Sequence, residues 1–569
     1  MPPLPPAILP ALLLSRYLFF LTQRPISRSN THYLQQRIHG LQSLAGVLAN
    51  VDTPGTATAV ALLRGLNPGN VRETAERLQL QLLPAARAEL PPGYVVADTA
   101  LPEDFLGAAG RVLLVFGPAI GIGDEIICFP LPSRVKAVNP AAEVVVLTAY
   151  EGLWDRVSGV DRHGCYRDHD HLLAALRGQD ALGGFDVVVL VDFENPELYR
   201  AVTADGGIGR YAELSLGARV LAAVDNHDRW VYRPPQATGC STNFYDTLDR
   251  LAWAMGLPAG EPAARFDTLT GRRPASDGAE LVVYACPFTS KYDPSPRYWT
   301  RLLCSLLPAE PARPVRVVVD PGTNSSTRRF SAQLAQAAAA HHDGTAVTVE
   351  QATPDVRQRL SVRGVFAELD RADVVVCTDS FTAHAAPLFG CTTLVLARPG
   401  LENWRAPHPR SFHFDGDGPL ADVVGGMRQV LGHHGVLRPQ DRQVPPLGAP
   451  EQRLVAAGRD LARLLAGGHG GADGGDGSSG ADVERVRAAY SCLAAARDAV
   501  VQRLPGWPAD ARGLLRDEAY EIPMRRLESE RPVPRWARPA VLNHMEHHWL
   551  RWRNTNLHKY LELALGEAR

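Results

Sequence analysis

The sequence lacks a cysteine pattern typical of a metal site or of a disulfide framework. Its eight cysteines lie far apart along 569 residues, and no CxxC or Cys/His ligand spacing occurs. Several of them stand inside apolar runs, where a reduced, buried thiol is the ordinary state. We therefore expect no structural zinc site, and we expect a reducing, cytoplasmic location.

The sequence also lacks an excess of charge and a long apolar run. Its 59 basic and 61 acidic residues give a net charge of −2, so composition predicts no attraction to nucleic acid. The apolar N-terminus has no basic start and is interrupted by Pro10 and Arg16. No run approaches the roughly 20 apolar residues that a membrane helix needs. We expect neither a targeting signal nor a membrane span.

What the sequence does contain is two series of buried-strand patterns, each strand followed by a helical pattern. This alternation predicts βαβ units and parallel sheets, an α/β fold. The expected strands lie at 112–119, 143–148, 185–192, 218–225, 281–287, 315–320, 346–350, 373–379, 392–397 and 411–415. The expected helices in these series lie at 151–157, 168–178, 298–307, 328–341 and 362–372.

The two series divide the chain into domains. We predict a helical region over 1–100, Rossmann-like domains over 101–242 and 243–450, a helix and Gly-rich linker over 451–480, and a helical region over 481–569. Two Rossmann-like domains facing a cleft form the GT-B architecture, here with added helical N- and C-terminal regions.

The stretch ADVVVCTDSFTAHAAPLFGC, from Ala372 to Cys391, carries the strongest local signal in the chain. A continuous apolar run suits a strand that is buried on both faces. The turn after it, Thr378–Thr382, opens a helix, where backbone N–H groups and the helix dipole favour a phosphate. This turn is our candidate for a diphosphate site.

A second glycine-containing turn follows the first strand of the first series. It reads Gly121-Ile122-Gly123-Asp124-Glu125. The glycines allow the backbone to approach a ligand closely. The third glycine of a dinucleotide fingerprint is absent, so this turn does not indicate a dinucleotide site.

These two stretches resemble glycosyltransferase family 9, the heptosyltransferases that build the inner core of lipopolysaccharide. The matching segments are VLLVFGPAIGIGDEIICFPLPSRVKAVNP and VVVCTDSFTAHAAPLFGCTTLVLARPGLENWRAP. The resemblance covers roughly residues 110–435. It implies an N-terminal acceptor domain and a C-terminal donor-binding domain.

The resemblance implies a catalytic role for Asp124. In an inverting transfer, a carboxylate takes the proton of the acceptor hydroxyl as that oxygen attacks the anomeric carbon, and the family's loop aspartate has this role. The other interpretation of Asp124 is a helix-capping or first-turn acid. Glu125 should point elsewhere along the helix and is the second candidate base.

The resemblance also implies the donor-binding residues. They are Gly121, Gly123, Thr289, Ser290, Lys291, Asp379, Ser380, Phe381, Thr382 and His384. Lys291 would place a positive charge on the diphosphate; a solvated lysine beside a turn is the alternative. Phe381 replaces the family's glycine, and Pro387 removes an N–H and is expected to kink the helix.

The predicted function is a metal-independent, inverting glycosyltransferase that uses a nucleotide-diphosphate sugar, such as ADP-heptose or another sugar donor. We expect no cofactor beyond this co-substrate, and a glycan or natural-product hydroxyl as acceptor. The helical termini could bind a protein partner or a second copy of the chain. Two alternatives stay open: a GT-B nucleotide-sugar epimerase, and a degenerate non-catalytic scaffold that acts through its helical termini.

Overall fold

A computed structural model describes the chain in two compact units. The first comprises 1–236, 244–271 and 360–363, and the second comprises 237–243, 272–359 and 364–569. Within these units the structure describes residues 56–65, 67, 94–97, 104–117, 121–176, 184–191, 210–214, 221–225, 229–232, 245, 257, 266–271, 280–288, 295–308, 310–342, 346–353, 356, 361–397, 405–436, 448–468, 479–503, 553 and 555–566.

The first unit is built on an eight-stranded sheet with the order β1-β8-β7-β6-β5-β2-β3-β4. Its strands are β1 (Tyr94–Ala97), β2 (Arg111–Phe116), β3 (Glu143–Thr148), β4 (Arg162–Cys165), β5 (Val187–Val191), β6 (Arg210–Leu214), β7 (Leu221–Asp225) and β8 (Arg229–Tyr232). Five neighbouring strands of this sheet, β6, β5, β2, β3 and β4, are parallel to one another. Strand β7 runs antiparallel to both β6 and β8. The predicted parallel core is confirmed.

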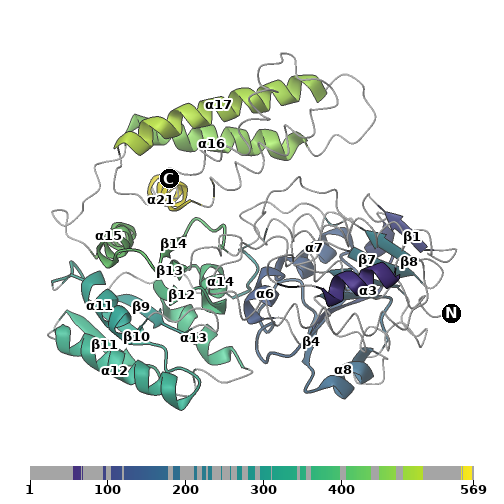
Figure 1. The fold of residues 1–569 in the computed structure, drawn as a ribbon, viewed down its shortest axis with the longest axis horizontal. Coiled ribbons are helices and arrows are strands. Elements are labelled where there is room, and N and C mark those ends of the chain that lie inside the picture. The colour runs from purple at the N-terminus through teal and green to yellow at the C-terminus, as the bar shows by residue number, and fades with distance from the viewer. Residues whose placement is uncertain are drawn as a thin grey trace. The chain divides into compact units, whose positions relative to one another are not determined.

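The first unit also contains helices (Figure 1). They are α3 (Thr56–Arg64), α5 (Asp104–Gly107), α6 (Ile122–Ile127), α7 (Pro130–Val138) and α8 (His169–Leu176). The helix predicted over 151–157 is wrong. Gly152 has a φ of 79°, in the left-handed region, and a Cβ there would lie 2.3 Å from Cγ of Arg363. Arg363 is in turn bound to Glu151 and Asp155, so tertiary contacts fold this segment into turns.

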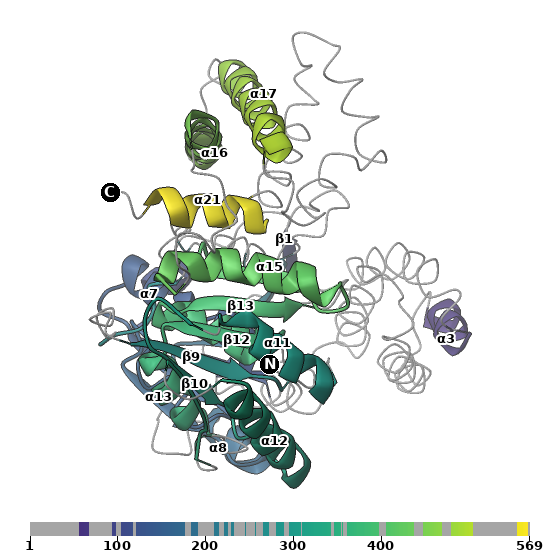
Figure 2. The ribbon, with the colours of Figure 1, turned by 90° about the vertical axis from the view of Figure 1, so that its left-hand side faces the viewer.

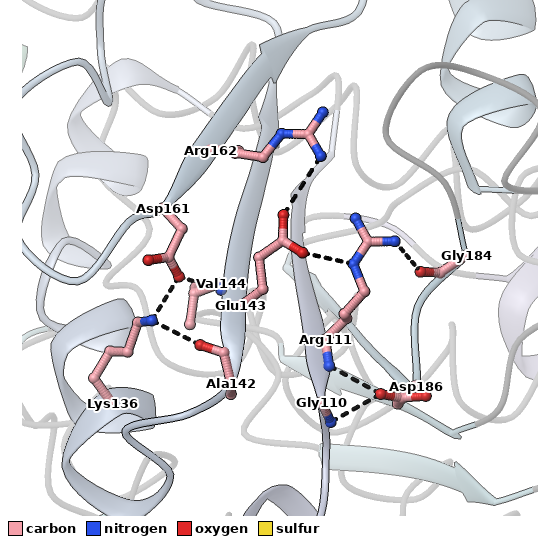
Figure 3. Close-up of polar contacts among 10 residues, drawn as sticks. All are labelled: Gly110, Arg111, Lys136, Ala142, Glu143, Val144, Asp161, Arg162, Gly184 and Asp186. Atoms are coloured by element: carbon pink, nitrogen blue, oxygen red, sulfur yellow. Dashed lines mark hydrogen bonds and ion pairs between the residues drawn. The ribbon is translucent and has the colours of Figure 1, made fainter.

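Charged side chains tie the strands together at the amino-terminal end of the first sheet (Figure 3). Asp186, just before β5, accepts hydrogen bonds from the backbone N–H groups of Gly110 and Arg111, 2.8 and 2.9 Å long. The Arg111 guanidinium binds Glu143 of β3 at 2.8 Å. The opposite, carboxyl-terminal end of the sheet carries none of these contacts, and it is there that α6 begins.

The second unit contains a six-stranded, fully parallel sheet with the order β11-β10-β9-β12-β13-β14. Its strands are β9 (Leu281–Cys286), β10 (Val315–Val319), β11 (Val347–Gln351), β12 (Val374–Thr378), β13 (Thr392–Ala397) and β14 (Ser411–Asp415). In chain order this is 3-2-1-4-5-6, the order of a dinucleotide-binding fold. The predicted Rossmann-like topology is confirmed for this unit.

The helices of the second unit are α11 (Pro296–Leu306), α12 (Ser325–His341), α13 (Arg363–Arg371), α14 (Phe381–Ala385), η3 (Ala386–Phe389), α15 (Leu420–Leu431), η5 (Gly432–His434), α16 (Ala449–Gly468), α17 (Ser479–Arg503) and α21 (Asn556–Gly566). In α11, Ser295 caps the first turn by accepting the Tyr298 N–H at 3.2 Å. Its apolar face, which includes Trp299 and Leu303, is buried at helical spacing.

The C-terminal helices belong to the core of the second unit. Leu454 and Leu461 of α16, and Val486 and Leu493 of α17, are buried in the same hydrophobic cluster as the sheet. Figures 1 and 2 both place α21 between α15 and the α16–α17 pair. The described part of the helical C-terminus is therefore packed onto this unit.

Several predictions fall on other residues. Residues 243–257, the start of the predicted domain 243–450, lie outside the described residues except for positions 245 and 257. The same holds for most of the predicted N-terminal helices and for positions 469–478 of the Gly-rich stretch.

Candidate functional site

Asp124 lies in the first turn of α6, which begins beyond the carboxyl end of β2. Gly121 is the N-cap residue that precedes the helix, and the Asp124 carboxylate accepts the Gly121 N–H at 3.3 Å. The capping interpretation of Asp124 is therefore correct as a description of its local contact. Its side chain is partly buried, and a capping carboxylate keeps oxygens with which to accept a further proton.

Glu125, the next residue, points in another direction, as expected from its helical position. It is fully buried, and it accepts hydrogen bonds from the Trp154 indole at 3.0 Å and from the Thr148 hydroxyl, whose Oγ1 lies 2.9 and 2.8 Å from the two carboxyl oxygens. Burial raises the pKa of Glu125 to about 8, against the lowering effect of both hydrogen bonds. Because both carboxyl oxygens of Glu125 lie against Thr148 or Trp154 inside the protein, and because the group holds its proton at neutral pH, Glu125 is unsuited to the role of base.

Tyr150 is a residue that sequence reasoning missed at this end of the sheet. It is partly buried two residues after β3, and its backbone N–H donates to Thr148 Oγ1 at 3.1 Å. Burial, followed by the charges of Glu125 and Asp124, raises its pKa to about 12. The phenol is thus protonated at neutral pH and lies within the electrostatic reach of Asp124. A tyrosine just after a strand carries no sequence signal for this.

In the second unit the turn after β12 lies at the point where the strand order reverses, between β9 and β12. Open α/β sheets bind ligands at this switch point, beyond the carboxyl ends of the strands. The Thr382 hydroxyl lies 3.5 Å from Sγ of Cys286, the last residue of β9. Asp379, mostly buried, donates its backbone N–H to Leu396 O of β13 at 3.2 Å. The turn is thereby held against both neighbouring strands.

Two hydroxyl groups in this turn are buried without a hydrogen-bond partner. They are Oγ1 of Thr378, the last residue of β12, and Oγ of Ser380, the residue that precedes α14. A buried hydroxyl that lacks a partner is destabilising, and buried polar groups are normally satisfied. Both hydroxyls therefore have hydrogen-bonding capacity that no protein group in the structure uses.

His384 lies in α14 and is buried, with 5% exposure. The charges of Lys559, Arg405 and His384 all contribute, after burial, to lowering the pKa of His413 in β14. His384 thus lies within electrostatic reach of His413. Phe381 is partly buried at the first position of α14.

Pro387 interrupts the helix that carries His384. The α-helix ends at Ala385, and Ala386–Phe389 continue as a 3₁₀ turn that closes at Gly390, with a φ of 80°. The α-helical hydrogen-bond pattern thus ends before Pro387, which has no N–H to continue it. Thr289, Ser290 and Lys291 lie outside the described residues.

No group of three or more His, Cys, Asp or Glu side chains is placed to hold a metal ion in the ranges given above. No helix in those ranges combines the length and apolar character that crossing a membrane requires.

Comparison with known protein families gave no matching family model, and no curated protein matched the chain. Solved structures did match. The glycosyl transferase family 9 structure from Veillonella parvula DSM 2008 is 11% identical, covers 54% of this chain and 85% of its own, and has a TM-score of 0.35. The E. coli heptosyltransferase WaaC with ADP is 15% identical, with 57% and 99% coverage and a TM-score of 0.39.

A third structure, E. coli ADP-heptose lps heptosyltransferase II, is 13% identical, with 51% and 86% coverage and a TM-score of 0.34. All three are glycosyltransferases of the kind that the two sequence motifs resemble.

Proposed function

We propose that the protein is a glycosyltransferase that moves a sugar from a nucleotide-diphosphate donor to a hydroxyl acceptor. The observation that carries this proposal is the position of the Thr378–Thr382 turn, which includes the hydroxyls of Thr378 and Ser380, at the switch point of a 3-2-1-4-5-6 parallel sheet. A diphosphate supplies the acceptor oxygens that these donors lack. The motif resemblance to family 9 supports the same assignment.

In the proposed reaction Asp124 is the general base. The acceptor oxygen forms a bond to the anomeric carbon while the bond from that carbon to the diphosphate breaks. The hydroxyl proton passes to the Asp124 carboxylate, and the nucleoside diphosphate leaves with the bonding electron pair. Attack opposite the leaving group inverts the anomeric centre. Charge on the leaving diphosphate is offset by side chains of the protein, without a metal ion.

The second unit supplies the donor seat of this proposal. Asp379, Ser380, Phe381, Thr382 and His384 form the turn that receives the diphosphate. Thr289, Ser290 and Lys291, which follow β9 in the sequence, are assigned to donor binding by the resemblance to family 9. Gly121 and Gly123 give the Asp124 turn its close backbone approach.

The test is a thermal-shift panel with ADP-, GDP-, UDP- and dTDP-sugars on the full chain. We expect one nucleotide to raise the melting temperature in a concentration-dependent way, because a ligand that binds only the folded state stabilises it. The responding donor is then incubated with candidate acceptors, and the product sugar is analysed for linkage and anomeric configuration. Absence of any shift would overturn the donor site and would favour a scaffold without catalysis.

A further inference from the structure

Glu125 is a buried acid that the proposed transfer step does not use. Its carboxyl group lies among aromatic rings: the Trp154 ring stacks on Phe116 with 5.0 Å between centroids, and it packs against Phe129 at 4.7 Å. Both phenylalanines and Trp154 are fully buried or nearly so. Such surroundings penalise a charged carboxylate far more than a neutral carboxyl group.

The hydrogen bonds of Glu125 connect three segments of the first unit. Glu125 lies in α6, Thr148 is the last residue of β3, and Trp154 lies in the turns that follow β3. The groups that bind the carboxyl are a hydroxyl and an indole, and both are neutral. The Glu125 backbone N–H donates to Gly121 O at 3.1 Å, so the same residue also closes the first turn of α6.

Within the described residues, the groups whose charges act on Glu125, or on which its charge acts, are acids. Asp124 on α6 raises the Glu125 pKa, and Glu125 in turn raises the pKa of Tyr150 after β3, Cys165 in β4 and Tyr166 after β4. Each of these neighbours is neutral when it holds its proton and negative when it loses it, so none of them can stabilise a negative charge on Glu125. The neutral carboxyl group is therefore the form of Glu125 that fits its site at neutral pH.

Building on the proposed function, we propose that Glu125 is a positioning residue that works as a neutral carboxyl group. It fastens the first turn of α6 to Thr148 and Trp154, and so holds the adjacent Asp124 carboxylate at the carboxyl end of β2. The same state keeps a second negative charge away from the base. Ionisation of Glu125 loosens this anchor.

The anchoring is tested by stability alone, without substrate. Wild type and Glu125→Gln are melted between about pH 5 and about pH 9, because glutamine keeps the size and the hydrogen bonds but cannot ionise. Folded Glu125 holds its proton up to about pH 8, whereas in the unfolded chain it loses it near pH 4.5. The wild type should therefore lose melting temperature relative to the variant as pH rises from about 5 to about 8, and then level off. A difference that does not change with pH would overturn the neutral state.

A matched control is Asp170→Asn, which removes an exposed acid in the first turn of α8 in the same unit. This variant should show no such trend. If Glu125→Gln fails to fold, Thr148→Val provides the second test, since it removes one anchor and leaves the carboxyl group; its melting temperature should fall at every pH. An unchanged melting temperature for Thr148→Val would overturn the anchor.

The link to Asp124 is tested with the donor found by the thermal-shift panel. Glu125→Gln should keep turnover within about threefold at pH 7 and should remove a decline above about pH 8 that the wild type shows. Glu125→Ala should lower kcat by about tenfold or more with KM for the donor unchanged. A Glu125→Gln variant as inactive as Asp124→Asn would overturn the positioning role. A chain that transfers no sugar refutes the proposed function, while the melting data still decide the anchor.

Discussion

The side-chain amide of Asn556 makes both backbone hydrogen bonds of His413 that a neighbouring strand would make. Asn556 Oδ1 accepts the His413 N–H at 2.8 Å, and Asn556 Nδ2 donates to His413 O at 2.7 Å. His413 lies in β14, the edge strand of the second sheet. One turn of α21 thus blocks a sheet edge that would otherwise expose unpaired backbone groups.

Asn556→Ala should destabilise the second unit by about 2–4 kcal/mol, because it leaves two buried backbone groups of His413 without partners. Lys559 of the same helix donates from Nζ to Ala406 O and Ser411 O at 2.8 Å each. We therefore expect a similar loss of stability for Lys559→Met. The measurement is the shift of the thermal midpoint. Arg463→Ala, at an exposed pair on α16, serves as the control and should change the free energy of unfolding by less than about 0.5 kcal/mol.

Two adjacent glycines of α15 predict opposite effects of the same substitution. A Cβ on Gly425 would meet nothing within 4 Å, whereas a Cβ on Gly426 would lie 2.7 Å from Cε1 of Phe414 in β14. Gly425→Ala should stabilise the protein by up to about 1 kcal/mol through helix propensity. Gly426→Ala should destabilise it by about 1–3 kcal/mol, because the helix must move off the sheet. Equal melting temperatures for the two variants would contradict this packing.

Asp124→Asn should lower turnover by about 10²–10⁴-fold and leave donor binding unchanged. Asparagine retains an oxygen that can accept the Gly121 N–H, so the first turn of α6 is preserved while the proton acceptor is lost. The two readings of Asp124, cap and base, are therefore separable by turnover and melting temperature. Asp170→Asn, the exposed first-turn acid of α8, should be fully active. Near-normal turnover of Asp124→Asn would refute its role as base.

Thr378→Val and Ser380→Ala should each weaken nucleotide-sugar binding by about tenfold or more, because each removes a hydroxyl that we assign to a charged oxygen of the donor. Neither substitution breaks a hydrogen bond within the protein, since both hydroxyls lack partners in the free chain. Thr393→Val, an identical change at the amino end of β13, is the matched control. Equal donor affinity in all three variants would contradict the assignment of the donor diphosphate to this turn.

Sequence patterns were sufficient to predict the position of the strands that are buried on both faces. The runs that became β3, β12 and β13 are continuous and β-branched, and their bounds were predicted within a residue or two. β4, which reads Arg162-His-Gly-Cys165, was missed because an edge strand with half-exposed polar residues has no apolar run. β1 and β8 pair with each other far apart in sequence, which no local pattern reveals.

The same limit applies to the candidate site. Asp124 and the Thr378–Thr382 turn have local signatures, namely a glycine turn and a buried strand that ends in polar residues. Glu125 has none, because its burial depends on Trp154, 29 positions along the chain. Lys559 likewise reads as an exposed lysine of an amphipathic helix, and only the docking of α21 against β14 shows that it is buried at 1% exposure.

The two units should respond to pH in opposite directions. In the second unit, burial is the largest effect that lowers the pKa of His434 to about 4 and that of His558 to about 3, with Arg410 and Arg553 adding to the respective shifts. Both histidines are therefore neutral when folded, while the unfolded chain binds protons below about pH 6.5. Their contribution is complete above that pH and declines as pH falls, by about 2 kcal/mol each at about pH 5.

Glu125 of the first unit acts the other way, losing its contribution as pH rises from about 5 to about 8. Thermal melts at about pH 5, 6.5 and 8.5 test the contrast. His558→Leu should reduce the loss of melting temperature between pH 6.5 and 5 without altering the loss between 6.5 and 8.5, and Glu125→Gln should do the reverse. His341→Gln, at an exposed position in the last turn of α12, is the control for the loss between pH 6.5 and 5, which it should not change. A single variant that reduces the loss of melting temperature both between pH 6.5 and 5 and between pH 6.5 and 8.5 would contradict the separate origin of the two effects.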